Sequence, residues 1–225
     1  SWQRLYCHLT VPRHPCTGRL SVLSRPPIHG MIVHAMVSGF DAGLMLDRQW
    51  HLLRGEMERT KEPTLLAVGR ILDEAGVAYA IIGGVAAQIH LPEPRTTLDI
   101  GLAVVGCDTI PRDRLEAAGF AHHVRFVHSE NWRGPDGTPV QFTDDPALAG
   151  PIARAETIER GGVRLRVIRR VDLLHEKLRA GSDAARRSSK RLQDLGDAQA
   201  LLEADPSLAA ELTPAERALL ERFPG

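Results

Sequence analysis

Short apolar runs and longer stretches of helical period alternate along most of the chain. Residues 79–82 form a brief apolar run that is partly β-branched, which is typical of a buried strand. Before it, apolar side chains recur at helical spacing from Leu65 to Ala75, with Pro63 and Gly76 placed where a helix begins and ends. Further strands are predicted over residues 98–105, 120–128, 140–143, 157–160 and 163–168, and further short helices over residues 46–60, 85–90 and 111–118.

The pattern becomes helical from Arg170 onward. Three helices are predicted in this part of the chain, over residues 171–180, 183–204 and 213–222. Gly181 interrupts the first two of them, because glycine disfavours a helix interior. Thr213 suits the N-cap of the third helix, and Pro214 suits its first position. Strands followed by helices predict an α+β fold.

The change of pattern also sets the expected domain boundaries. Residues 45–169 are expected to form an α/β domain and residues 170–225 a helical C-terminal subdomain, with a cleft between them. Residues 1–44 are rich in proline, sustain no period and contain no acid before Asp41, so we predict a disordered or wrongly included leader. Its prolines would interrupt the amphipathic helix of a transit peptide. Its Cys and His spacing matches no common zinc framework; the residues are Cys7, His8, His14 and Cys16.

Composition narrows the class of protein. Lysine plus arginine and aspartate plus glutamate both number 28, so no net charge draws the chain to nucleic acid or membranes. Any anion-binding site must therefore be local. The three cysteines are scattered and odd in number, which predicts a reducing, cytoplasmic compartment rather than a disulfide framework. No apolar run approaches the roughly 20 residues that a membrane-spanning helix needs.

The stretch from residue 78 to residue 105 carries the strongest chemical signal. A predicted strand meets Gly83 and Gly84, a short helix follows, and a second strand returns with Asp99 at its start. The first N–H groups of a helix lack partners within the helix and favour anions such as phosphate. Asp99 would bring a metal to the same place. The simpler alternatives are a tight turn at the two glycines and an ordinary surface acid at Asp99.

This stretch resembles the signature of the polymerase-β-like nucleotidyltransferase superfamily. Gly83-Gly84 followed by Arg95-Thr96-Thr97-x-Asp99 is similar to the branch that contains abortive-infection type IV toxin nucleotidyltransferases. The resemblance implies a mixed sheet with flanking helices that binds a nucleoside triphosphate and Mg²⁺ (or Mn²⁺). Gly83, Gly84, Arg95 and Thr97 would bind the nucleotide, and Asp99 the metal. It also implies transfer of a nucleoside monophosphate to an RNA, protein or small-molecule acceptor, and a cognate antitoxin as partner.

The chain departs from this pattern at the metal site. The superfamily has Asp-x-Asp on the second strand, so that two carboxylates share one face, but Gly101 stands in the second position. A third carboxylate is expected on the strand over residues 140–143, where Gln141 or Thr143 would face the site; Asp144 and Asp145 lie just beyond. The competing hypothesis is therefore a catalytically degenerate module that binds nucleotide or a partner.

A second block of resemblance lies in the predicted C-terminal helices, and the two blocks together span most of residues 64–205. Lys177 and Asp194 match a phosphate-binding lysine and an assisting aspartate of the same branch, with Asp197 nearby, so the resemblance implies that they are catalytic residues together with Asp99. Arg186, Lys190, Asp194 and Asp197 recur at helical spacing and share one face. The alternatives are a lysine stem packed among leucines for Lys177, a plain surface pair between Lys190 and Asp194, and a pair between Arg95 and Glu93.

Overall fold

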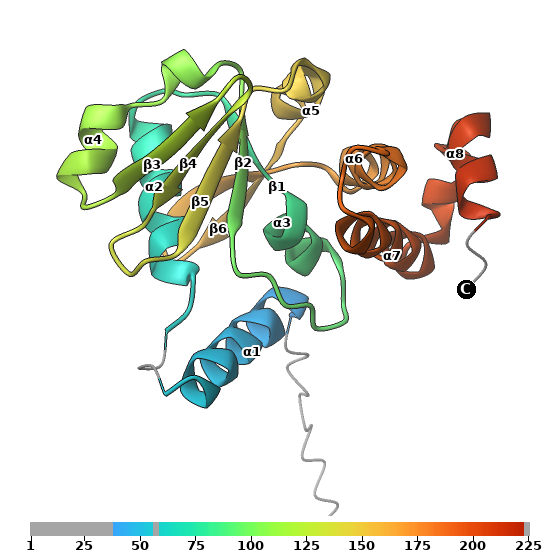
Figure 1. Ribbon diagram of the computed structural model, residues 1–225, viewed down its shortest axis with the longest axis horizontal. Coiled ribbons are helices and arrows are strands. Elements are labelled where there is room, and N and C mark those ends of the chain that lie inside the picture. The colour runs from blue at the N-terminus through green and yellow to red at the C-terminus, as the bar shows by residue number, and fades with distance from the viewer. Residues whose placement is uncertain (1–37, 56–58, 223–225) are drawn as a thin grey trace, which may run out of the picture. The chain divides into compact units, whose positions relative to one another are not determined.

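A mixed sheet of seven strands forms the centre of the computed structural model, which describes residues 38–55 and 59–222 (Figure 1). Its strands run in the order β3-β4-β5-β2-β1-β7-β6. The central β1 and β2 pair antiparallel, whereas β2 pairs parallel with β5 and β1 pairs parallel with β7. The strand bounds are β1 Tyr79–Ile82, β2 Ile100–Val104, β3 Ala121–Phe126, β4 Ser129–Arg133, β5 Pro139–Thr143, β6 Glu156–Arg160 and β7 Val163–Val167.

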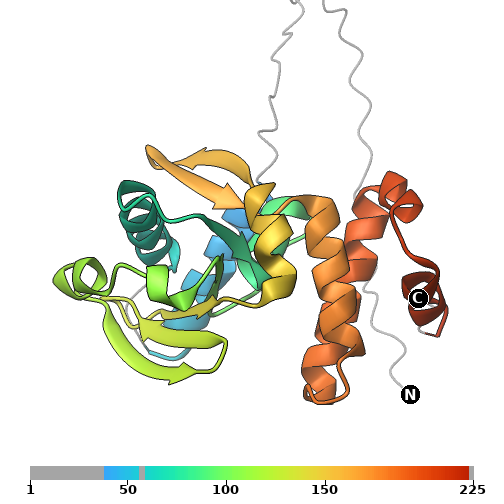
Figure 2. The same ribbon diagram turned by 90° about the horizontal axis from the view of Figure 1, so that it is seen from above.

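Helices flank this sheet, and the α+β class with a mixed sheet is confirmed. α3 contacts β1 and β2 on one side and α6 and α7 on the other, and α6 and α7 lie side by side in both views (Figure 1 and Figure 2). None of the helices within the described residues is long and apolar enough to cross a membrane. The helix bounds are α1 Gly39–Leu53, α2 Glu62–Glu74, α3 Gly83–His90, α4 Arg112–Ala117, α5 Ala149–Ala153, α6 Arg170–Ser182, α7 Ser188–Ala204 and α8 Pro214–Leu220.

Local sequence signals account for most of these elements. The predicted β6–β7 hairpin is present, and Gly161 and Gly162 in its turn both have positive φ. At the start of α8, Thr213 and Glu216 form the reciprocal hydrogen bonds of a capping box, with Pro214 at the first position. Strand β2 starts at Ile100, so Asp99 lies immediately before the strand.

Three sequence predictions need correction, and the first concerns the leader. α1 starts at Gly39, so residues 38–44 belong to the folded part of the chain. The Ser38 hydroxyl caps α1 by accepting from the Asp41 amide N–H, and the side chains of Phe40 and Leu44 are buried. Residues 1–37, with the four Cys and His residues considered for zinc, lie outside the described residues.

The second correction concerns Gly181, which does not end α6. The helix continues to Ser182, and the connection to α7 follows it. A Cβ atom at Gly181 would lie 2.6 Å from the side chain of Leu195. The glycine therefore allows α7 to approach α6 closely rather than breaking the helix.

The third correction concerns β4, which was not predicted. It lies between β3 and β5 in the sheet, so these two do not pair with each other. Its inward positions are Glu130 and Trp132, both fully buried, and Glu130 forms an ion pair with Arg112. A buried glutamate hid the apolar alternation that marks a strand.

Candidate functional site

α3 starts directly after β1, without a connecting loop. Its first two residues are both glycine, and glycine is needed at each position for a different reason. Gly83 has φ of 65°, and an added Cβ there would meet nothing within 4 Å. Gly84 lies under the loop that leads to β2, where an added Cβ would overlap the Thr97 hydroxyl and lie 2.6 Å from an Arg95 guanidinium nitrogen. Gly83 thus provides the backbone conformation, and Gly84 the space for the loop.

Gly83→Ala is expected to destabilise the protein by about 1–2 kcal/mol, because alanine is disfavoured at positive φ. The matched control is Gly196→Ala in α7, where no neighbouring atom obstructs a Cβ and φ is not positive. There alanine is expected to raise stability by about 0.5–1 kcal/mol, because it favours a helix interior. Urea unfolding of both variants measures the difference. Equal effects would contradict the conformational role of Gly83.

The loop over residues 95–99 is held from two directions. Arg95 forms two hydrogen bonds to the carboxylate of Asp197 in α7, at 2.6 and 2.8 Å, instead of pairing with Glu93. From the other side, the buried Lys61 donates to the Thr97 carbonyl at 3.0 Å and forms an ion pair with Asp47 in α1. Helices from both ends of the described chain therefore fix the segment that carries Asp99.

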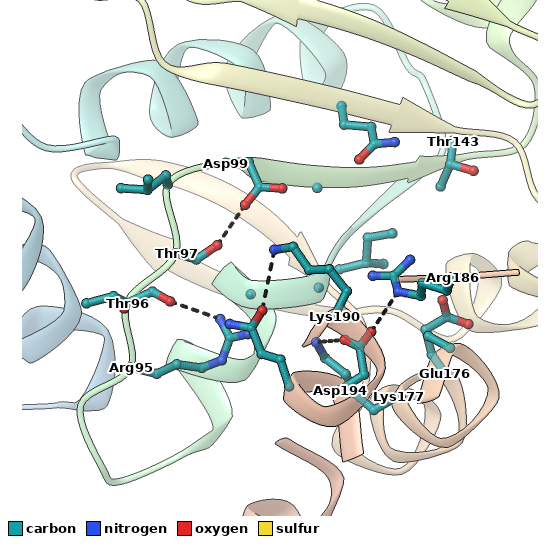
Figure 3. A pocket seen from close by; sticks show the side chains of 18 of the residues that line it. Arg95, Thr96, Thr97, Asp99, Thr143, Glu176, Lys177, Arg186, Lys190 and Asp194 are labelled. Carbon is teal, nitrogen blue, oxygen red and sulfur yellow. Dashed lines mark hydrogen bonds and ion pairs between the residues drawn. The ribbon is translucent and has the colours of Figure 1, made fainter. Parts of the chain in front are cut away.

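Asp99 is the last residue of this loop and lines the cavity. It is exposed, and one of its carboxylate oxygens accepts a hydrogen bond from the Thr97 hydroxyl at 2.9 Å. Gly83, Gly84 and Asp99 line the same cavity, and Figure 3 shows Asp99 beside Thr97. The structure thus brings the two glycines and the acid to one cavity, and their roles in binding remain predictions.

The neighbouring strand β5 is the one predicted to face the site, and it supplies no carboxylate. Gly101 on β2 is in register with Gln141 on β5, and both line the cavity with Thr143. Asp144 accepts instead from the Cys107 amide N–H, at 3.1 Å. Asp145 lines the cavity but forms an ion pair with Arg179 at 2.7 Å.

This donor set decides which metal arrangement the site fits. Within residues 38–55 and 59–222 no group of three or more His, Cys, Asp or Glu residues could hold a metal. A pair of catalytic metals needs several shared carboxylates, and the adjacent lining residues Gly101 and Gln141 supply none. Mg²⁺ retains several waters and binds through one or two carboxylates plus substrate phosphates. The site therefore fits one substrate-bound Mg²⁺ at Asp99, and does not fit a metal pair.

Lys177 and Asp194, predicted as catalytic residues, lie in one ion-pair network. The Lys177 ammonium is 2.8 Å from Asp194 and 2.6 Å from Asp197. Asp197 also binds Arg95, and Asp194 lies 3.0 Å from Arg186. Lys177 and Asp194 both line the cavity although each is only 4% exposed. We refer to these five residues as the ion-pair network; the catalytic roles of Lys177 and Asp194 remain predictions.

Lys190 differs from the other cations of the cavity. Arg95, Lys177, Arg179 and Arg186 all pair with carboxylates. Among the described residues Lys190 pairs with no carboxylate, and its ammonium makes only a 3.4 Å hydrogen bond to Gln193 rather than the predicted pair with Asp194. It is exposed and faces the cavity (Figure 3). An ammonium without a counter-ion is available to a bound anion.

The cavity has a volume of about 690 Å³, within the usual range of small-molecule sites. The start of α3, the 95–99 loop, β5, α6 and α7 line it, and α1 contributes the side chains of Leu46, Asp47 and Trp50. The sequence prediction missed this contribution of α1. Its only signal was Leu46 and Trp50, four residues apart on one helical face.

Two charged groups beside the cavity have shifted pKa values, the buried Lys61 behind the 95–99 loop and the partly buried Glu176 in the cavity wall. Burial lowers the pKa of Lys61 below its ordinary value, although the hydrogen bond and the attraction to Asp47 oppose the shift. Burial raises the pKa of the Glu176 carboxyl, which Arg179 opposes by hydrogen bonding and attraction. Both groups therefore depend on their ion-pair partners to remain charged, since burial disfavours each charged form.

Comparison with known proteins gives only distant likenesses. No protein-family profile matches the chain, and no curated protein does. Among solved structures, an antigenic nucleotidyltransferase-like protein from Paracoccidioides brasiliensis is 19% identical, with a TM-score of 0.44 over 71% of this chain and 91% of that one. ANT(2")-Ia in complex with adenylyl-2"-tobramycin is 16% identical, with a TM-score of 0.47 over 73% and 100%. JHP933 from Helicobacter pylori is 14% identical, with a TM-score of 0.48 over 72% of each chain. At these values the likenesses assign no substrate or role to this chain.

Proposed function

We propose that this protein binds a nucleoside triphosphate in the cavity and transfers its nucleoside monophosphate to an acceptor. One observation carries the proposal: a single cavity contains the start of α3, the Asp99 carboxylate and the unpaired ammonium of Lys190. A helix start and a free ammonium both favour phosphate. The carboxylate beside them would repel an anion alone. It would, however, bind a divalent cation that is coordinated by the phosphates.

Each group has a defined part in binding. The first N–H groups of α3, at Gly83 and Gly84, would donate to phosphate oxygens, and Lys190 would neutralise phosphate charge from the opposite wall. Thr97 orients Asp99 through its hydroxyl. Arg95 would contribute indirectly, because its ion pair with Asp197 holds the loop over the start of α3.

Asp99 would hold Mg²⁺ (or Mn²⁺), which lowers the negative charge of the triphosphate when bound. In the transfer, an acceptor hydroxyl oxygen forms a bond to the α-phosphorus, and the bond from that phosphorus to the β-phosphate oxygen breaks. Pyrophosphate leaves, and the hydroxyl proton passes to water. The chain's own contribution is to position the triphosphate and neutralise its charge. We propose that Lys177 and Asp194 act by fixing the wall that presents Arg95 and Arg186.

A second candidate function has a specific observation in its favour. Gly101 and Gln141 stand in register where the resemblance implies carboxylates, so the site lacks the oxygens of a metal pair. A protein with this site could bind the triphosphate and turn none of it over, as a nucleotide-sensing or partner-binding module. RNA or protein as acceptor, an antitoxin as partner and a cytoplasmic location remain predictions from the sequence.

The direct test incubates the full chain with each α-³²P-labelled triphosphate, Mg²⁺ or Mn²⁺, and total RNA or the protein itself as acceptor. Label transferred to the acceptor with release of pyrophosphate supports the transferase. Saturable binding without transfer supports the module. Absence of binding of all four triphosphates overturns both functions.

Lys190→Met is expected to weaken triphosphate binding by at least about 10-fold, because a charge-assisted hydrogen bond contributes about 1.5–3 kcal/mol. Isothermal titration calorimetry with ATP and Mg²⁺ measures the affinity. Arg187→Met is the matched control, since Arg187 is exposed at the start of α7 and does not line the cavity. Equal affinity in both variants would remove Lys190 from the site.

A further inference from the structure

The end of the cavity at α1 differs chemically from the rest. Trp50 is 46% exposed and Leu98 is 52% exposed, and with Leu46 they form an apolar wall. Large apolar side chains are usually buried, so two in one ligand-sized cavity mark a surface suited to an apolar group. Trp132, by contrast, is buried in the sheet core.

The opposite end of the cavity is lined by charged side chains of both signs, and among the described residues Lys190 is the cation there that pairs with no carboxylate. Arg179, Arg186 and Lys190 come from α6, α7 and the turn between them. α3 adjoins both ends, since it contacts α1 as well as α6 and α7 (Figure 1). The cavity therefore suits a ligand with a flat apolar group at one end and an anionic group that reaches Lys190.

We propose that the base of the nucleoside triphosphate stacks on Trp50, with Leu46 and Leu98 beside it. The inference rests on the proposed function and deepens it by assigning the end of the cavity that the base occupies. An indole ring offers a flat face to a heteroaromatic ring, and such stacking accepts every base. The phosphates then extend past Gly83 toward Lys190.

The neighbouring second cavity supports this orientation. It has a volume of about 260 Å³ and shares Asp47, Trp50, Thr97 and Leu98 with the main cavity. Open space therefore adjoins the Trp50 wall beyond the site itself, so this end can accommodate both purines and pyrimidines. We accordingly expect ATP, GTP, CTP and UTP to bind with affinities within about 10-fold of one another.

The test compares two ligands that share the phosphates but not the ring. ATP and inorganic tripolyphosphate, each with Mg²⁺, are titrated into the full chain by calorimetry. Trp50→Ala is expected to weaken ATP binding at least about fivefold and to leave tripolyphosphate binding unchanged, because only ATP loses stacking. Trp50→Phe, which restores an aromatic face, is expected to recover most of the ATP affinity.

The controls separate failure of the inference from failure of the function. Leu53→Ala alters an 84% exposed residue of the same helix outside the cavity and is expected to change neither affinity. If Trp50→Ala weakens both ligands equally, or neither, the stacking proposal is wrong while triphosphate binding stands. If the native protein binds neither ligand, the proposed function fails and the inference fails with it.

Discussion

Asp99→Asn is expected to lower nucleotidyl transfer by at least about 100-fold. Removing a residue that only hydrogen-bonds to a metal ligand already lowers metal affinity or activity by about 10–100-fold, and loss of the ligand itself should have a larger effect. Within the described residues no group of three or more metal-ligating side chains is present to take over its role. The amide keeps the size of the side chain and its capacity to accept from Thr97, so the loop should remain folded. The measurement is label transfer from the preferred triphosphate at saturating Mg²⁺.

The control for this variant is Glu93→Gln. Glu93 carries the same charge, is exposed, precedes the same loop and does not line the cavity. It should retain full activity, which would exclude a general effect of lost negative charge. Retention of more than about a tenth of native transfer by Asp99→Asn would refute the metal-binding role of Asp99.

Lys177→Met is expected to destabilise the protein by about 3 kcal/mol, because removal of one member of a buried ion pair leaves uncompensated charge. Lys177 is 4% exposed and contacts two carboxylates that are themselves buried, Asp194 and Asp197. In this variant Asp194 still pairs with Arg186, and Asp197 still pairs with Arg95. The expected loss of stability is therefore at the lower end of the usual range. Urea unfolding of the full chain gives the free energy of unfolding.

Lys190→Met provides the comparison for this stability measurement. The same substitution at this exposed lysine, which pairs with no described carboxylate, should change stability by no more than about 0.5 kcal/mol. Adding Asp194→Asn to Lys177→Met should cost less than the two single changes together, since both remove the same interaction. Additive losses, or a near-neutral Lys177→Met, would argue against the ion-pair network as a stabilising element.

The sequence predicted the elements whose signals are local. The apolar run of β1, the β6–β7 turn at Gly161-Gly162 and the capping residues of α8 depend on neighbours in the chain. β4 was missed because Glu130 is balanced by Arg112, a residue of another element. Such compensation depends on the fold and leaves no periodic trace in the sequence.

For the candidate site, too, local groupings could be predicted from the sequence and long-range pairings could not. Gly83, Gly84 and Asp99 lie close along the chain and share a cavity, as their spacing indicated. The pairing of Arg95 with Asp197 joins residues 102 positions apart, and no local pattern chooses Asp197 over Glu93. Trp50 was missed because the position of its helix beside the site follows from tertiary packing alone.

The double restraint of the 95–99 loop has a consequence for how the protein can be divided. One tether reaches α7 through Arg95 and Asp197, and the other reaches α1 through Lys61 and Asp47. A fragment that kept the sheet but ended before residue 170 would leave Arg95 without its counter-ion. The sheet and the C-terminal helices therefore do not form independent units. Transferring either one to another protein would transfer only part of the cavity.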